Sequence, residues 1–156
     1  VVYCAYLLKI VNSSPDRQMQ LLDILEEHPR IIVFYNFNYE LDILKSIPYD
    51  KDVKIAEWNG HQHQPIPKSK RWVYLVQYTA GAEGWNCIFT DTMIFYSLNY
   101  SYRMMEQASG RIDRMNTPYK DLNYYQLVTP GTIDDAVLRC IKKKKIFNEK
   151  KFFGQT

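Results

Sequence analysis

Short runs of β-branched and aromatic residues alternate along this chain with segments of helical periodicity. The run at 31–35, Ile-Ile-Val-Phe-Tyr, is apolar throughout, which is typical of a strand buried on both faces of a parallel sheet. The alternation predicts an α/β fold: a right-handed, doubly wound parallel sheet with helices on both faces and loops gathered at the carboxyl ends of the strands. The other expected strands cover residues 53–56, 72–77, 92–96 and 124–128.

Helix start signals precede the amphipathic segments. Ser14 followed by Pro15 predicts a helix with a serine cap and a proline at its first position. Asn38 is placed to cap a second helix, and Thr132 opens a capping-box pattern before the last one. Residues 1–11 are almost uniformly apolar, so periodicity alone does not distinguish a buried strand from a buried helix there.

Length and composition allow a single domain with a sizeable core. The 156 residues are 46% hydrophobic and 24% charged, which is ordinary for a soluble globular protein. No apolar run approaches the roughly 20 residues of a membrane span and no signal peptide is visible, so we expect a soluble intracellular protein. The net charge is +3, but residues 142–151 hold six lysines and one glutamate, a local +5 that leaves −2 on the remainder. Bulk charge therefore does not predict nucleic-acid binding.

Cysteines and histidines give no strong sign of a disulfide or metal site. Cys4, Cys87 and Cys140 are odd in number and widely spaced, which favours reduced, structural thiols. His61 and His63 lie in the polar, proline-rich stretch HQHQPIPKSK, which we expect to be an exposed loop. No supporting cluster of Cys, Asp or Glu accompanies the two histidines, so we expect no metal site.

The stretch 107–114, Gln-Ala-Ser-Gly-Arg-Ile-Asp-Arg, carries the strongest chemical signal. On a helix, Gln107, Gly110, Arg111 and Arg114 share an arc about 100° wide, because their offsets are 0, 3, 4 and 7. Two guanidinium forks, an amide and a glycine on one face are suited to meeting an anion. The alternative is a surface helix whose arginines form weak exposed ion pairs. The apolar residues fall on a different arc: Met105, Ala108, Ile112 and Met115.

A second candidate stretch, 78–86, follows the expected strand at 72–77. Its sequence is Tyr-Thr-Ala-Gly-Ala-Glu-Gly-Trp-Asn. Small residues and two glycines directly after a buried strand indicate a place where the backbone comes close to a partner. A tight strand-to-helix turn is the alternative, but such a turn would need neither Glu83 nor Asn86.

Both stretches resemble motifs of superfamily 2 helicases and translocases. Residues 107–114 match Q-x-x-G-R-x-x-R, the motif whose arginines face the γ-phosphate of ATP between two RecA-like lobes in that family. Residues 80–86 are similar to the A-G-x-E-G-x-N motif of Snf-type ATPases, the chromatin-remodeller-like branch. From Pro15 onward, through IIVFYNF, AEWNG and YQLVTPGTIDD, the order resembles a C-terminal RecA-like lobe. The segment FYNFNYELDIL is similar to segments of phage or prophage members of this group.

The resemblance implies roles for individual residues. Arg114 would be the arginine finger and Arg111 its catalytic neighbour, because a planar, permanently charged fork stabilises the charge of a phosphoryl-transfer transition state. The residues implied near the nucleotide are Gln107, Gly110, Glu83 and Gly84. The residues implied at the nucleic acid are Asn36, Gly60, Thr79 and Asn86.

The resemblance also implies a domain plan and partners. Residues 1–14 would form a preceding helix or linker, 15–152 the helicase C-terminal lobe, and 153–156 a tail. ATP and Mg²⁺ would act in the full-length protein, with Mg²⁺ held by an N-terminal RecA-like lobe that this chain lacks. The chain has neither the Gly-Lys of a phosphate-cradling loop nor an Asp-Glu pair, and it starts with Val1, so we expect a fragment that binds no cofactor and hydrolyses no ATP alone.

The other expected partner is duplex DNA. We expect no membrane partner. We expect the protein in the cytoplasm of a bacterial or phage-infected cell, or in the nucleus of a eukaryote. Two alternatives stay open: a non-catalytic RecA-like module for nucleic-acid binding or protein docking, and the lobe of an RNA helicase. Tyr78 departs from the small hydroxyl residue that related proteins often have. The lysines at 142–145 would be either the solvated end of the last helix or a DNA contact.

Overall fold

A five-stranded parallel sheet forms the centre of the molecule. The structure is a computed structural model that describes residues 2–80 and 86–154. Within this part of the chain the strand order is β2-β3-β1-β4-β5, and every neighbouring pair is parallel. All the expected strands are confirmed, with boundaries shifted by at most two residues. They are β1 (Arg30–Tyr35), β2 (Lys54–Trp58), β3 (Trp72–Gln77), β4 (Thr92–Phe95) and β5 (Asn123–Gln126).

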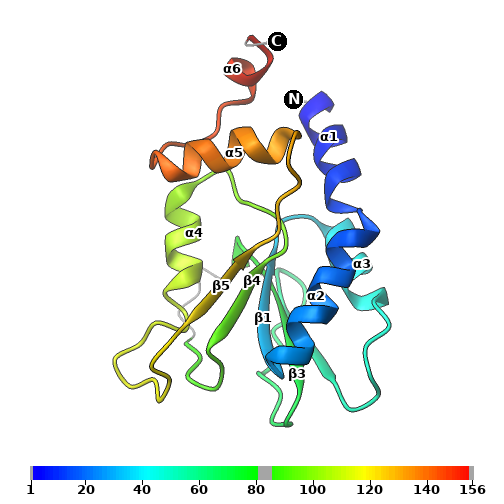
Figure 1. The fold of residues 1–156 in the computed structure, drawn as a ribbon, viewed down its shortest axis with the longest axis vertical. Helices are drawn as coiled ribbons and strands as arrows, with labels where there is room; N and C mark the ends of the chain where they lie inside the picture. Colours follow the sequence, from blue (N-terminus) through cyan, green and yellow to red (C-terminus); the bar gives the residue numbers. More distant parts are fainter. Residues whose placement is uncertain (1, 81–85, 155–156) are drawn as a thin grey trace.

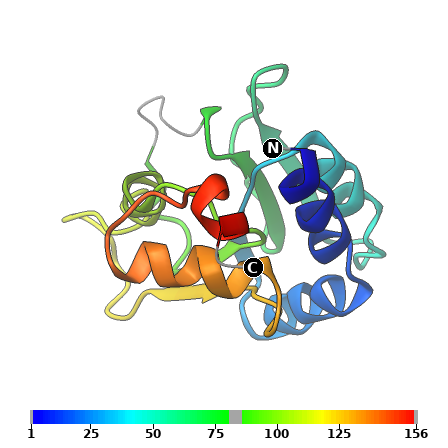
Figure 2. The same ribbon diagram turned by 90° about the horizontal axis from the view of Figure 1, so that it is seen from above.

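Helices cover both faces of the sheet, as Figures 1 and 2 show. Side chains alternate along β1: Ile31 and Val33 pack in the cluster that holds α2 and α3, whereas Ile32 and Phe34 pack in the cluster that holds α4 and α5. The doubly wound arrangement is therefore confirmed. The helices are α1 (Val2–Asn12), α2 (Pro15–Glu27), α3 (Asn38–Ser46), α4 (Tyr102–Ser109), α5 (Ile133–Lys142) and α6 (Glu149–Gly154).

The two ends of the sheet carry different elements. The strands run upward in Figure 1, and α5, α6 and the start of α1 lie at or beyond their carboxyl ends. α1 is a helix, and Cys4 and Leu8 on it pack in the same core cluster as α4 and α5. The segment 110–122, between α4 and β5, lies at the opposite end of the molecule.

The start of α3 differs from the expected cap. The N-cap residue is Phe37 rather than Asn38, which already belongs to the helix. Glu40 takes over the capping role, because one of its carboxylate oxygens accepts from the backbone N–H of Phe37 at 2.6 Å and of Asn36 at 2.9 Å. A buried carboxylate therefore closes this helix start, and the prediction for Asn38 is wrong.

The start of α5 confirms its capping residue and holds a buried ion pair. The Thr132 hydroxyl accepts from the backbone N–H of Asp134 at 3.2 Å. Asp134 pairs with Arg17 of α2 at 2.7 Å, and both side chains are 3% exposed. Arg17 also donates to the side-chain oxygen of Asn12 at 2.7 Å and to the carbonyl of Tyr96 at 2.8 Å. One guanidinium thus connects α1, α2, the end of β4 and α5.

The connection from β2 to β3 is extended rather than helical. Residues 59–71, all of which the structure describes, contain no helix, although parallel strands are usually joined through one. His63 forms an isolated antiparallel bridge with Trp58 and stacks on its ring at 4.3 Å. The Tyr74 hydroxyl donates to the Gln64 carbonyl at 2.6 Å. The predicted exposed loop is confirmed, and His61 is exposed within it.

The described residues show neither a metal-binding cluster nor a membrane-spanning helix. No group of three or more His, Cys, Asp or Glu side chains among them is arranged to hold a metal ion. None of the helices in the described ranges is long and apolar enough to cross a membrane.

Candidate functional site

The helix expected to carry the Q-x-x-G-R-x-x-R stretch ends before its arginines. α4 stops at Ser109, and Gly110 is the C-cap residue, with φ −69° and ψ −8°. The carbonyl of Arg111 accepts from the backbone N–H of Cys87 at 2.9 Å, so it does not continue the helical ladder. The predicted single helical arc is therefore wrong, because a poor helix former is followed by a residue whose carbonyl binds a different segment.

The apolar side of the same stretch is mostly confirmed. Met105, Ala108 and Ile112 are buried in the core cluster beneath α4 and α5. Met115, the fourth expected member, is fully exposed. It follows the end of the helix, so the helical spacing that placed it with the others no longer applies.

Arg111 and Arg114 lie on the turns that follow α4. Arg111 is half-buried, whereas Arg114 is exposed. Burial, and then the like charge of Arg114, lower the pKa of the Arg111 guanidinium. Backbone bonds from Arg114 N–H to the Ile112 carbonyl and from Thr117 N–H to the Arg114 carbonyl, both 3.1 Å, fix the turns. The fold therefore holds two guanidinium groups in each other's electrostatic field.

The other two residues of this motif occupy the end of α4. Gln107 is exposed in its last turn. Gly110 has ordinary helical angles, and a Cβ there would meet only the carbonyls of Gln107 and Glu106, each at 3.6 Å. Backbone conformation does not require glycine at this position.

The A-G-x-E-G-x-N stretch joins two parts of the molecule. Its first residue, Ala80, follows the carboxyl end of β3, and its carbonyl accepts from the indole N–H of Trp58 at 3.2 Å. Its last residue, the exposed Asn86, directly precedes Cys87, which is bonded to Arg111. Glu83 and Gly84 lie outside the described residues. The two described ends of the stretch therefore lie apart, Ala80 at the carboxyl edge of the sheet and Asn86 beside the arginine turn.

Three of the expected nucleic-acid residues gather at the carboxyl edge. Asn36, Gly60 and Thr79 follow β1, β2 and β3, which are neighbours in the sheet. Gly60 and Thr79 are exposed, and open space surrounds the position of a Cβ at Gly60. These positions stand at the opposite end of α4 from Arg111 and Arg114. The chain that leads into α4 also leaves β4 at this edge, and α4 then carries Arg111 and Arg114 away from it.

The side chain of Asn36 is used inside the protein. Its amide nitrogen donates to the Ser97 hydroxyl at 2.8 Å and to the Leu98 carbonyl at 3.0 Å. Its amide oxygen accepts from the amide of Asn99 at 3.0 Å. Asn36 therefore positions the chain after β4.

A hollow lies beside this amide pair. Its volume is about 420 Å³, and β1 and β4 end at it, between the crossover to α3 and the crossover to α4. Ligands of open α/β sheets bind at such switch points. The lining residues are Ala5, Leu8, Asn36, Phe37, Leu98, Asn99, Tyr100 and Glu149.

Glu40 belongs to the same polar cluster, although sequence reasoning did not single it out. Its side chain is fully buried. Burial raises the pKa of the Glu40 carboxyl, against the opposing effect of the Ser97 hydroxyl and of the Phe37 and Asn36 N–H groups. The available signal was its position, because a glutamate at the third residue of a helix is typical of a capping box.

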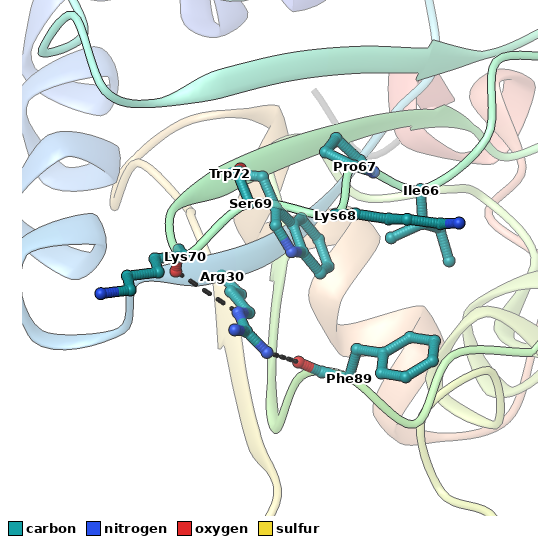
Figure 3. Close-up of a pocket in the computed structure, with 8 residues that line it drawn as sticks. All are labelled: Arg30, Ile66, Pro67, Lys68, Ser69, Lys70, Trp72 and Phe89. Carbon is teal, nitrogen blue, oxygen red and sulfur yellow. Dashed lines mark hydrogen bonds between the residues drawn. The ribbon is translucent and has the colours of Figure 1, made fainter.

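A separate hollow of about 370 Å³ lies at the amino ends of β1 and β3 (Figure 3). Arg30 lies at it and donates to the carbonyls of Lys70 at 3.3 Å and of Phe89 at 3.4 Å. The Tyr119 hydroxyl donates to the same Phe89 carbonyl at 3.2 Å. These bonds hold the chain just after Cys87 in place and so support the arginine turn.

Several known proteins are similar to this chain in sequence or in fold. The helicase conserved C-terminal domain matches residues 16–116. The chromatin-remodeling ATPase INO80 of Mycosarcoma maydis is 28% identical over 127 residues, which cover 81% of this chain and 6% of that protein. The ISWI chromatin-remodeling complex ATPase ISW2 of Saccharomyces cerevisiae is 27% identical over 150 residues, which cover 86% of this chain and 13% of that protein.

The crystal structure of the C-terminal part of the Fun30 ATPase domain has a TM-score of 0.71 at 18% identity, and the match covers 87% of this chain and 48% of that one. This likeness concerns the fold, and it confirms the RecA-like sheet. The chain spans between 6% and 13% of the length of the two relatives named above. Because the family match covers more than half of the chain, the protein belongs to the helicase conserved C-terminal domain family.

Proposed function

We propose that this chain is the second motor lobe of an ATP-dependent DNA translocase or helicase of the Snf type. The observation that carries the proposal is the 2.9 Å hydrogen bond from the Cys87 N–H to the Arg111 carbonyl, which joins the residue directly after one motif to the first arginine of the other. The names of the INO80 and ISW2 relatives, both chromatin-remodeling ATPases, support the same class. A phage or prophage source stays a prediction.

In this proposal the arginine turn completes a nucleotide site between two lobes. Bound ATP supplies the phosphoryl group that is transferred to water. Arg114 is exposed and reaches across a cleft as the finger, while the half-buried Arg111 stays fixed to Cys87 and contributes a second positive charge. Gln107 and Gly110 line the approach, with glycine leaving room for the phosphates. Two guanidinium groups suit an anion by their charge.

The remaining parts of the site are assigned to the N-terminal lobe of the parent protein. Among the described residues no acidic cluster is arranged to hold a metal ion, so we place the Mg²⁺ ligands on that lobe. Glu83 and Gly84 keep their proposed place near the nucleotide. The proposed DNA contacts are Gly60, Thr79 and Asn86, all exposed, with Asn36 positioning the chain after β4 behind them.

The proposed mechanism uses the two described ends of the A-G-x-E-G-x-N stretch. Ala80 lies at the carboxyl edge with Gly60 and Thr79, whereas Asn86, the remaining proposed DNA contact, lies beside Arg111. Closure of the two lobes on ATP would move the arginine turn, and the adjacent Asn86 with it, relative to the bound DNA.

The test is ATP hydrolysis by the full-length parent, titrated with duplex DNA, single-stranded DNA and RNA. Arg114→Ala should lower the DNA-stimulated rate about 10³-fold or more while leaving DNA affinity unchanged. Arg103→Ala is the matched control, because Arg103 is an exposed arginine on α4 outside the motif. Equal rates for both variants would contradict the finger role. Hydrolysis stimulated only by RNA would indicate an RNA helicase, and no hydrolysis under any condition would indicate a non-catalytic module.

A further inference from the structure

The lysine run after α5 does not form the solvated face of a helix. α5 ends at Lys142, and the chain then turns through Lys144, which has a positive φ of 55°. The backbone N–H of Lys144 donates to the Ile141 carbonyl at 2.9 Å, and that of Lys145 to the Cys140 carbonyl at 2.8 Å. Glycine is the usual residue at this place in such a helix ending. The turn gives the lysines on either side of it fixed backbone positions.

The turn folds these lysines over a cavity of about 310 Å³. Four positively charged residues line it: Arg139, Lys143, Lys145 and Lys151. Among the described residues that line this cavity, none is acidic. The other lining residues are Ala136, Cys140, Ile146, Phe147, Asn148 and Phe152. We call this cavity and its four cations the basic pocket.

The basic pocket is anchored to the carboxyl edge of the sheet. Phe147 is buried, packs edge-on against Tyr100 with ring centroids 4.7 Å apart, and donates its N–H to the Tyr100 carbonyl at 3.0 Å. The Tyr100 hydroxyl donates to Glu149 at the start of α6 at 2.8 Å. Figures 1 and 2 place α5 and α6 at this end of the molecule. The pocket thus shares an end with the exposed Gly60 and Thr79.

We propose that the basic pocket binds the phosphate backbone of the nucleic acid on which the parent protein moves. This inference rests on the proposed function for the choice of nucleic acid. Four positively charged residues line the pocket, and no acidic residue belongs to its described lining, which favours an anionic ligand of several charges. Lysine ammonium groups bind phosphates as point charges without reading sequence. The aromatic residues of the pocket, Phe147 and Phe152, are packed on the core, so the ligand is the backbone rather than a stacked base.

The test uses the full-length parent and a labelled duplex of about 20 base pairs, with affinity measured by fluorescence anisotropy from about 50 to about 200 mM salt. The triple variant Lys143→Gln, Lys145→Gln, Lys151→Gln should lower the slope of log affinity against log salt by about 0.9 for each phosphate that it no longer binds, so by about 2 to 3 in all. The matched control is Lys51→Gln, Lys54→Gln, Lys68→Gln, which removes the same charge from exposed lysines near the amino ends of the strands. It should keep the wild-type slope.

A second variant distinguishes binding by the basic pocket from a general effect of the lysine run at 142–145. Lys144 does not line the basic pocket, so Lys144→Gly removes one positive charge and should leave the salt slope unchanged. An equal slope for the pocket triple and its control would overturn the inference, even where DNA-stimulated hydrolysis persists and the proposed function stands. Poly-glutamate serves as a probe for an acidic protein partner. Loss of poly-glutamate binding in the pocket triple variant, with an unchanged salt slope for duplex DNA, would overturn the inference in favour of such a partner. A wild-type parent that neither binds nor responds to any nucleic acid would instead refute the proposed function.

Discussion

At the scale of single residues, the carboxyl of Glu40 is a titratable group held away from water. It is fully buried and accepts two backbone N–H bonds at the start of α3. Its pKa is raised, so the folded chain holds the Glu40 proton more tightly than the unfolded chain does. The stability that this proton gives is complete below the ordinary glutamate pKa of about 4.3 and is lost as pH rises through the raised value.

Replacing the Glu40 carboxyl by an amide should remove this loss of stability with rising pH. In Glu40→Gln the amide oxygen still accepts from Phe37 and Asn36, but no charge forms in the buried site. The urea midpoint of the 156-residue chain should therefore fall less between about pH 4 and about pH 8 in the variant than in the wild type. Asp42→Asn, a carboxylate on the same helix that is not buried, is the control and should keep the wild-type profile. Parallel profiles for Glu40→Gln and wild type would show that the carboxyl is not the titrating group.

Residue types in the sequence are enough to identify the arginine motif but not the roles of its neighbours. The spacing of Arg111 and Arg114 is visible in the sequence, and so is the burial of Ile112. The partner of Arg111 is not, because Cys87 lies far earlier in the chain and meets it only through the fold. In the same way, the sequence predicts a ligand contact for Asn36, whereas Asn99 and Ser97 use its amide internally.

At the scale of elements, Arg17 fastens helices on both faces of the sheet. Its spacing with Leu21 and Leu25, at intervals of four, puts it on the buried stripe of α2, and that spacing could have predicted its burial. What the spacing could not give is its partner. Asp134 lies at the start of α5 and accepts both from Arg17 at 2.7 Å and from the N–H of Thr129 at 2.9 Å.

Removing the charge on α2 should be costly. Arg17→Met should lower the free energy of unfolding by about 3 to 5 kcal/mol, because it leaves Asp134 buried without its cation. Adding Asp134→Asn should recover part of that loss. Arg71→Met is the contrasting case: Arg71 pairs at 3.0 Å with Asp50 and Asp52, both mostly exposed, and its loss should cost less than about 1 kcal/mol. Urea unfolding of the chain measures all three, and similar losses for Arg17→Met and Arg71→Met would contradict the argument.

The ends of elements are harder to predict than their existence. The strands are predictable because continuous apolar runs have few alternatives to a buried parallel strand. The helical arc predicted through Arg114 runs past the end of α4, because Gly110 is compatible with a helix interior at modest cost. The bond from Cys87 to the Arg111 carbonyl, which accompanies the turn there, joins residues far apart in the sequence and is not visible in it. From the sequence, the lysines after α5 can likewise be mistaken for a continuation of the helix, because their composition does not indicate the positive φ at Lys144.

At the scale of the whole molecule, the fold separates two functions that the proposed motor needs. The exposed positions after β2 and β3, together with the basic pocket, stand at the carboxyl edge, whereas Arg111 and Arg114 stand at the far end of α4. Sequence could predict the sheet that creates these two ends. It could not predict which end each motif reaches, because that depends on the direction in which α4 runs back along the sheet.

This separation also predicts what the chain does alone. The arginine turn offers positive charge but neither a phosphate-cradling loop nor, among the described residues, a set of acidic side chains for Mg²⁺. The purified 156-residue chain should therefore show no ATP turnover above a blank, with or without duplex DNA, in an assay of phosphate release. Arg114→Ala in the isolated chain separates contamination from genuine activity, because turnover from a contaminant would be identical in both preparations. Turnover in the wild-type chain that Arg114→Ala abolishes would show that one lobe suffices, and the proposed division of the site between two lobes would be wrong.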